Sequence, residues 1–434
     1  MSSTKILLVI GSAILLTWSC QKENFNKYND AKETLVLASK DEYYSLVLQW
    51  ANLPTTRFKE FIVVRSMAPS LPQTELASIN PNEIVFRTQD NKDQTFRDSV
   101  FFSRVYYRLY AQTNSGLLYS NEISYNPNII NIRSGIISDF VIDPVNGSLF
   151  IFYNSRVIDK YNVSDMSFIS STNSIPYNFT SSQNASIRNC KNCKTELLVP
   201  IENKLYFIDA ETFKINEEVI NGNKIFNTAT DNKGNVYWTD SSTTDNVIVR
   251  YNPTLKEKKR LGEISPDKIL LRVSEEGQNI IVGTKLSMSQ IASFVFDDQG
   301  NSSSKHVNTQ IRIDWFNKGR VVQNYNGLSI VTGSEGLILN HELQSLLSLQ
   351  PQGAGYKNFV FSGDSKFLYA QSDNFKLIFR YNLVNNYEQD KSYNFRASPS
   401  FLFIYKQQLY GVGVIFIPEL GISRTVLEKI KMTE

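Results

Sequence analysis

The stretch VIVRYN at Val247–Asn252 decides the fold, because close variants of it recur along the chain. A short run of β-branched and aromatic residues that ends at an asparagine is typical of a strand leading into a turn. The variants are VIDKYN at Val157–Asn162, LIFRYN at Leu377–Asn382 and, more loosely, VLEKIK at Val426–Lys431. Such self-similarity indicates a repeat architecture in which each unit is one small sheet.

A hairpin precedes these phrases. Its turn is built from Asp, Asn and Gly at Asp143–Gly147 and at Asp231–Asn235, and an apolar strand follows at once, which is the composition of a tight turn. Further second strands are expected near Leu197, Asn279, Leu328, Phe367 and Leu409. A unit of about 40 to 45 residues predicts a β-propeller. We count seven blades over residues 128–434, and six or eight blades stay open alternatives.

The repeated phrases resemble the blades of YVTN- and NHL-type β-propellers. This resemblance implies a fold and no particular chemistry, because propellers host many unrelated functions. The last phrase falls on a third strand, so we expect Ile129–Ile132 to supply the fourth strand and close the ring. Closure would remove an exposed sheet edge. The alternative is that Phe416–Ile422 is itself the third strand and that no closure is needed.

Residues 34–125 show short strands and turn-rich gaps at the spacing of a β-sandwich. The expected strands lie at Leu46–Trp50, Phe61–Arg65, Ile84–Phe86, Thr95–Phe96 and Val105–Ala111. Trp50 on the second strand, the turn at Arg97-Asp98 and the stretch YRLYA at Tyr107–Ala111 resemble a fibronectin type III domain. The predicted fold class is therefore all-β, with an N-terminal immunoglobulin-like (fibronectin type III-like) sandwich followed by a seven-bladed β-propeller.

The first residues are typical of an export signal. Lys5 and an apolar run at Ile6–Leu16 precede Thr17-Trp18-Ser19-Cys20, and the run is too short to span a bilayer. The arrangement resembles a bacterial lipobox, which implies that residues 1–19 are a lipoprotein signal peptide and that Cys20 carries a lipid anchor such as palmitate. The alternative is ordinary signal-peptidase cleavage, which leaves Cys20 a free thiol.

The residues after Cys20 indicate an address and a linker. Gln21-Lys22-Glu23-Asn24 resembles the acidic tags that send lipoproteins of Bacteroidota-type bacteria to the cell surface. The polar residues 20–33 lack an apolar period, so we interpret them as a flexible tether. The tripeptide Asp98-Ser99-Val100 also resembles a site at which such bacteria O-glycosylate exported proteins, which makes Ser99 a candidate; a turn residue with nothing attached is the alternative.

The composition excludes several classes of function. The 45 Lys and Arg residues against 42 Asp and Glu give a net charge of +3 over 434 residues. This balance favours no nucleic-acid partner, because binding to a polyanion depends on many basic contacts. Two His and three Cys residues leave too few soft ligands for a multi-ligand zinc or haem centre. We therefore expect neither a cofactor nor a metal.

Cys190 and Cys193 lie where other blades carry the turn between the first and second strands. In an oxidising envelope we expect them to form a structural disulfide. A redox-active pair would need a thioredoxin-like strand and helix around it, and a metal site would need two more ligands. A reduced, idle pair, a redox pair and a metal site stay open alternatives.

Two apolar segments are candidate contact surfaces. Val412–Ser423 is far more apolar than a turn, with Pro418 barring a central strand, and Thr309–Lys318 carries Trp315-Phe316. Both are expected to be loops on the same face of the propeller, with the contact residues Trp315, Phe316, Ile415, Phe416 and Ile417. Exposed apolar patches mark protein or ligand contacts. In the alternative, Ile415 and Phe416 are ordinary strand residues and Trp315 packs between blades.

These observations predict a lipid-anchored protein of the outer membrane, exposed at the cell surface. We expect a non-enzymatic binding or scaffold role in which the propeller docks onto a membrane-protein complex and the sandwich acts as a spacer. One alternative is capture of glycans for a nutrient uptake system. Another is a propeller lyase or hydrolase with carboxylates in the central channel, since Asp, Glu and Tyr can suffice for acid–base chemistry.

Overall fold

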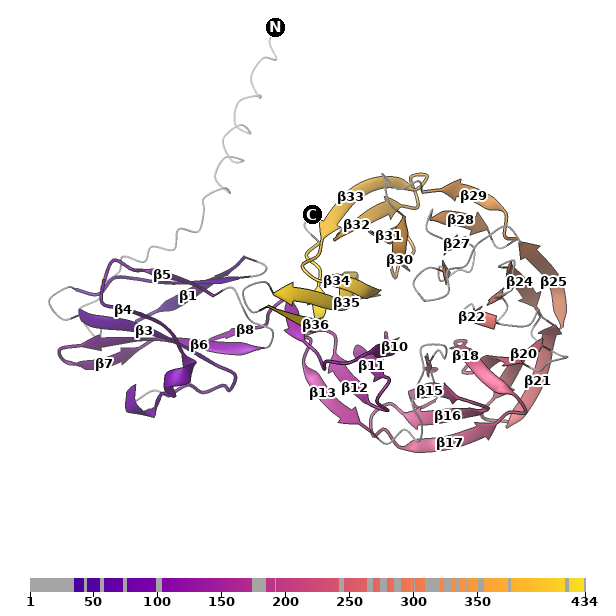
Figure 1. Ribbon diagram of the computed structural model, residues 1–434, viewed down its shortest axis with the longest axis horizontal. Helices are drawn as coiled ribbons and strands as arrows, with labels where there is room; N and C mark the ends of the chain where they lie inside the picture. Colours follow the sequence, from indigo (N-terminus) through magenta and orange to yellow (C-terminus); the bar gives the residue numbers. More distant parts are fainter. Residues whose placement is uncertain are drawn as a thin grey trace, which may run out of the picture. The chain divides into compact units, whose positions relative to one another are not determined.

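The computed structural model describes residues 35–432 in two compact units, Met1–Asn126 and Pro127–Glu434 (Figure 1). The segments outside the described residues are 1–34, 43–44, 55–57, 73–75, 99–103, 174–184, 192, 242–245, 264–267, 274–278, 285–289, 298, 300, 309–320, 324–328, 333–335, 341, 350–354, 374–375, 418–420 and 433–434. Nearly all regular structure is β-strand, so the predicted all-β class is confirmed. The helical elements of the described ranges are two short 3-10 turns, η1 (Leu76–Ser78) and η2 (Pro81–Glu83), and none of the described helices is long and apolar enough to cross a membrane.

The first unit is a sandwich of two antiparallel sheets. One sheet has the order β1-β2-β5, and the other has the order β4-β3-β6-β7 with β8 also paired to β6, which is an immunoglobulin-like arrangement. The strands are β1 (Leu37–Asp41), β2 (Leu46–Trp50), β3 (Phe58–Ser66), β4 (Ile84–Thr88), β5 (Thr95–Asp98), β6 (Val105–Thr113), β7 (Gly116–Tyr119) and β8 (Ile123–Tyr125). Each strand expected from alternation lies inside one of these elements.

Aromatic packing joins the two sheets of the sandwich. Trp50 of β2 meets Phe61 of β3 edge to face, with the ring centroids 5.7 Å apart, and both side chains are buried in one apolar cluster. The Tyr107 hydroxyl donates to Asp98 Oδ2 at 2.8 Å, and Arg65 Nη1 lies 2.7 Å from the same oxygen. A buried polar group is tolerated where it is hydrogen-bonded, so this trio satisfies the buried Asp98 carboxylate.

The second unit is a propeller. Among the described residues it has seven four-stranded antiparallel sheets, so the predicted blade number is confirmed. Blades one to three contain β10 (Ile137–Asp143), β11 (Ser148–Tyr153), β12 (Ile158–Asn162), β13 (Phe168–Thr172); β14 (Ser186–Arg188), β15 (Glu196–Ile201), β16 (Lys204–Asp209), β17 (Ile215–Ile220); and β18 (Lys224–Thr230), β19 (Val236–Ser241), β20 (Asn246–Asn252), β21 (Glu257–Glu263).

The remaining blades complete the ring (Figure 1). Blades four to seven contain β22 (Lys268–Val273), β23 (Asn279–Thr284), β24 (Gln290–Phe296), β25 (Ser302–Asn308); β26 (Val321–Gln323), β27 (Ser329–Thr332), β28 (Leu337–Asn340), β29 (Ser345–Ser348); β30 (Tyr356–Phe361), β31 (Phe367–Ser372), β32 (Leu377–Asn382), β33 (Glu388–Asn394); and β34 (Ser398–Tyr405), β35 (Gln408–Ile417), β36 (Ile422–Lys429), β9 (Ile129–Asn131). The four repeated phrases all fall on third strands, β12, β20, β32 and β36.

Blade seven is built from both ends of the propeller sequence. β9 pairs antiparallel with β36, with Leu427 opposite Ile130 and Glu428 opposite Ile129. The expected closing strand is therefore confirmed, although it ends at Asn131. Ile132 continues the contact, because its backbone N–H donates to the Thr425 carbonyl at 3.0 Å. This pairing covers an edge that β36 would otherwise expose.

The core of the propeller lies in the seams between blades. Phe150 and Phe152 of blade one share a buried cluster with Leu197 and Val199 of blade two. Further clusters join blades two and three, three and four, five and six, and six and seven. The cluster between blades seven and one contains Leu427 together with Leu149 and Ile151. Among the described residues, apolar contact thus joins neighbouring blades at six of the seven seams.

The turns fall on two opposite faces, because successive turns of an antiparallel sheet lie at opposite ends of its strands. We call the lower face the one with the turns between first and second strands, such as 144–147, 189–195 and 231–235. The upper face carries the turns between second and third strands, such as 154–157 and 202–203, and the links between blades.

Candidate functional site

The hairpin of β35 and β36 extends beyond the rest of blade seven on the upper face. β35 has ten residues, whereas the second strands of the other blades have six or fewer. Pairing of β34 with β35 ends at Val414, and pairing of β9 with β36 ends at Val426. Beyond Val414 and Thr425, the hairpin strands pair only with each other in the described residues. We call Val414–Ile417 and Ile422–Arg424 the blade-seven tip.

This finding corrects the expectation that Val412–Ser423 is a loop. Residues up to Ile417 belong to β35, and β36 begins at Ile422. A proline disrupts strand pairing only at its own position. Pro418 is therefore compatible with a strand that ends at Ile417. The apolar character of the segment belongs to two strands and not to a turn.

Alternation along β35 decides which tip residues are exposed. Tyr410 and Val412 are buried against Leu149 and Ile151 of blade one. Side chains two residues apart share a face of a strand, so Val414 and Phe416 continue this stripe. They lie where β34 no longer pairs with β35, and their side chains are 45% and 59% exposed. Large exposed apolar side chains on a rigid element mark a contact surface.

Ile415 points the other way and is only 3% exposed. It therefore does not belong to the exposed surface that the sequence suggested, because its face of β35 is covered. Ile417 ends β35, and its side chain lies outside the described residues. Trp315 and Phe316 also lie outside the described residues. Of the five expected contact residues, the structure thus places Phe416 at the surface and Ile415 in the interior.

Arg424 stands opposite Ile415 in the tip. Its Nε atom is buried, and no described residue accepts a hydrogen bond from it. A buried donor without an acceptor costs free energy. The sequence gives no sign of this buried donor, because it predicts the tip to be an apolar loop.

The link from the closing strand to blade one is held by an ion pair with the third strand of blade one. Arg133 Nε and Nη2 donate to the two carboxylate oxygens of Asp159 at 2.9 and 3.1 Å. These hydrogen bonds raise the pKa of the Arg133 guanidinium above its ordinary value. Such two-point pairs are among the strong hydrogen bonds of proteins. The same link carries Ile136, another highly exposed apolar side chain on the upper face.

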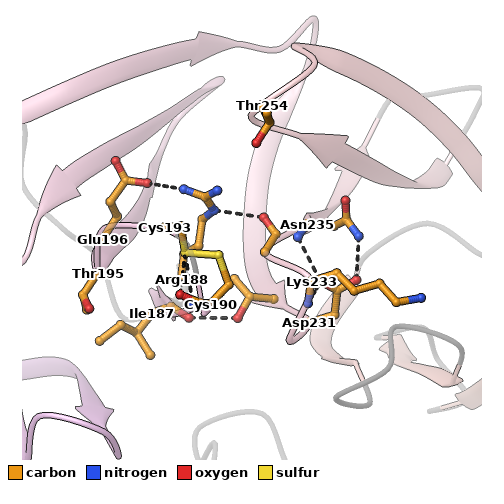
Figure 2. The surroundings of a disulfide bond; sticks show 12 residues. Ile187, Arg188, Cys190, Cys193, Thr195, Glu196, Asp231, Lys233, Asn235 and Thr254 are labelled. Atoms are coloured by element: carbon orange, nitrogen blue, oxygen red, sulfur yellow. Dashed lines mark hydrogen bonds and ion pairs between the residues drawn. A yellow bond between two sulfur atoms is a disulfide. The ribbon is translucent and has the colours of Figure 1, made fainter.

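The second feature is the disulfide between Cys190 and Cys193, with a Cα–Cα distance of 5.3 Å, on the lower face of blade two (Figure 2). Beside it, Arg188 Nη1 donates to Glu196 Oε2 at 2.7 Å and Nε donates to the Gly234 carbonyl of blade three at 2.9 Å. Asn216 donates to the second Glu196 oxygen at 2.9 Å. The guanidinium thus spans the seam between blades two and three.

Other candidate chemistry is thin within the described ranges. In those ranges, no group of three or more His, Cys, Asp or Glu side chains is placed to hold a metal ion. Cys20 and Ser99 lie outside the described residues. Within the described residues, the blade-seven hairpin protrudes from the ring of seven blades and is partly apolar, so it can bind a complementary surface.

No protein-family profile matches the sequence, and no curated protein matches it. The β-propeller domain of Cps50 (Swd1) from Myceliophteria thermophila is 11% identical, covers 70% of this chain and 100% of its own, and has a TM-score of 0.49.

Proposed function

We propose that the protein is a lipid-anchored scaffold of the outer membrane, exposed at the cell surface, whose propeller docks onto a membrane-protein complex without catalysing a reaction. In this proposal Cys20 carries the lipid, residues 20–33 form the tether, and the fibronectin type III-like sandwich is a spacer. The partner contact is the blade-seven tip.

The exposure of Phe416 is the observation that carries the proposal. Phe416 stands on a paired strand, so a partner would meet it without having to order a loop. Aromatic side chains dominate the energetics of protein interfaces, and preorganised contacts avoid an entropic cost. Val414, two residues away on the same face of β35, enlarges the exposed apolar contact.

The docking proposal is tested by affinity capture of the tagged full-length protein from detergent-solubilised native membranes. We expect a stoichiometric membrane-protein partner with the wild type and loss of that partner with Phe416→Ser. Val145→Ser is the matched control, because Val145 is 70% exposed on the lower face and should capture normally. A partner retained equally by both variants would exclude the tip as the contact.

The anchor is tested separately with Cys20→Ser. The wild type should incorporate labelled palmitate and remain with the membrane fraction, because an acyl chain with a second membrane contact anchors a protein stably. The variant should incorporate no label and be recovered in the soluble fraction. Unlabelled wild-type protein would show that Cys20 is not acylated.

A further inference from the structure

The loop 189–195, which contains the disulfide, contacts the blades on both sides of blade two. Toward blade one, Asn189 Nδ2 donates to Asp143 Oδ1 at 3.0 Å. Toward blade three, the contact runs through Gly234, whose carbonyl accepts from Arg188 at the base of the loop. The loop therefore connects three consecutive blades on the lower face. A disulfide that stabilised only its own hairpin would make no such contacts with the neighbouring blades.

The disulfide itself fills the seam with blade three. Gly234 has a positive φ of 81°, and a Cβ placed on it would lie 2.8 Å from Cys190 Sγ and 3.4 Å from Arg188 Nη2. Because 2.8 Å is below van der Waals contact, the Cys190 sulfur occupies the space that a side chain at residue 234 would need. Figure 2 shows the disulfide beside Arg188 and the turn formed by Asp231 and Asn235.

The seam between blades seven and one has the same arrangement, in which a side chain fills the space beside a turn glycine. Gly147, in the equivalent turn of blade one, has a φ of 67°, and a Cβ placed on it would collide with the Tyr405 hydroxyl of blade seven. In both seams the glycine of a lower-face turn receives a group from the preceding blade. In the seam between blades two and three the filling group is a disulfide, which a reductant can open. In the seam between blades seven and one it is the Tyr405 ring, which a reductant leaves unchanged.

We propose that the Cys190–Cys193 disulfide is a redox-sensitive lock on the lower-face seams of blade two. A dithiol reductant attacks one sulfur as its thiolate, passes through a mixed disulfide and closes to its own disulfide. Two electrons and two protons are transferred, and Cys190 and Cys193 become thiols. Both cysteines are half-buried, so a reductant can reach them. Once the loop is no longer cross-linked, Cys190 can leave the seam beside Gly234, and the hydrogen bonds of Arg188 to Gly234 and of Asn189 to Asp143 lose the loop geometry that supports them.

Hydrogen exchange of the full-length protein, oxidised and after dithiol treatment, tests the lock. Reduction should speed amide exchange about tenfold at 186–201, 231–237 and 143–148, since exchange reports local opening. The blade-six turn at 362–367 should be unchanged. The Cys190→Ser/Cys193→Ser variant should have the exchange rates of the reduced protein, and dithiol treatment should not change them. Faster exchange confined to 189–195, or spread over all seven blades, would overturn the proposal.

A double-mutant cycle tests the contact with Gly234 independently of the reductant. Gly234→Ala should destabilise the disulfide-bonded protein more than it destabilises the Cys190→Ala/Cys193→Ala variant, because the colliding sulfur is absent there. Backbone strain at the positive φ is common to both backgrounds and cancels. Equal penalties in the two backgrounds would show that the disulfide does not fill the seam.

Discussion

Ile130 of β9 lies directly opposite Leu427 of β36, so residues from the two ends of the propeller sequence share one sheet. Both side chains are buried in the cluster that joins blades seven and one. The pairing makes blade seven depend on residues that directly follow the sandwich in the sequence. It also provides the four-stranded base from which the blade-seven tip projects.

Truncation of Leu427 should destabilise the propeller strongly. Leu427→Ala removes a fully buried side chain, and such changes cost about 2 to 5 kcal/mol. Ile130→Ala should also destabilise, and the double variant should cost less than the sum, because the two residues face each other. Denaturant unfolding of the three variants measures these effects. Costs below about 0.5 kcal/mol would contradict closure by β9.

Two adjacent tip residues should respond in opposite ways to the same substitution. Ile415→Ser places a hydroxyl in a buried position and should lower the free energy of unfolding by about 2 kcal/mol or more. Phe416→Ser should change it by about 0.5 kcal/mol at most, because the side chain is exposed. Thermal and denaturant unfolding measure the free energy of unfolding of both variants. Equal destabilisation would mean that Phe416 is packed in solution.

Alkaline pH should weaken the propeller. Burial raises the pKa of Tyr161, Tyr369 and Tyr410 to about 12 each, against about 10 in an unfolded chain. The folded state holds these protons more tightly, so their stabilisation is complete below pH 10 and is lost as the pH rises toward 12. Unfolding free energies measured at successive pH values, with tyrosinate absorbance, should fall above pH 10. A flat profile up to about pH 12 would contradict this burial.

The stability of the sandwich should depend on the Tyr107 hydroxyl. Tyr107→Phe removes the donor to Asp98 and leaves the carboxylate with Arg65. Loss of a buried hydrogen bond to a charged group costs about 1.5 to 3 kcal/mol. Tryptophan fluorescence should follow this loss, because Trp50 packs in the sandwich core. Arg87→Ala, which removes an exposed ion pair with Glu60, is the control and should be near neutral.

Much of the propeller could be predicted because its information is local and repeated. The phrase ending in Tyr251-Asn252 marks a third strand, and the turn at Asp143–Gly147 marks a hairpin, through spacing and turn chemistry alone. Closure by Ile129–Ile132 followed from counting strands against the last phrase. Each of these inferences needs only neighbours along the chain.

The contact surface was harder to predict because its exposure depends on distant residues. Ile415 and Phe416 are both apolar and lie on opposite faces of β35, and which of the two faces is covered depends on residues distant in the sequence. The alternation of Tyr410, Val412, Val414 and Phe416 was a usable signal, but the proline after Ile417 suggested a loop. The contact of Cys190 with Gly234 joins two blades and has no signature along the sequence.

The most direct test of the docking account is site-specific photo-cross-linking in native cells. Benzoylphenylalanine is placed at position 416 or, as a control, at position 145 on the opposite face of the propeller. The account predicts one dominant adduct with a membrane protein from position 416 and none from position 145. The same adducts from both positions, or no adduct from position 416, would contradict docking through the blade-seven tip.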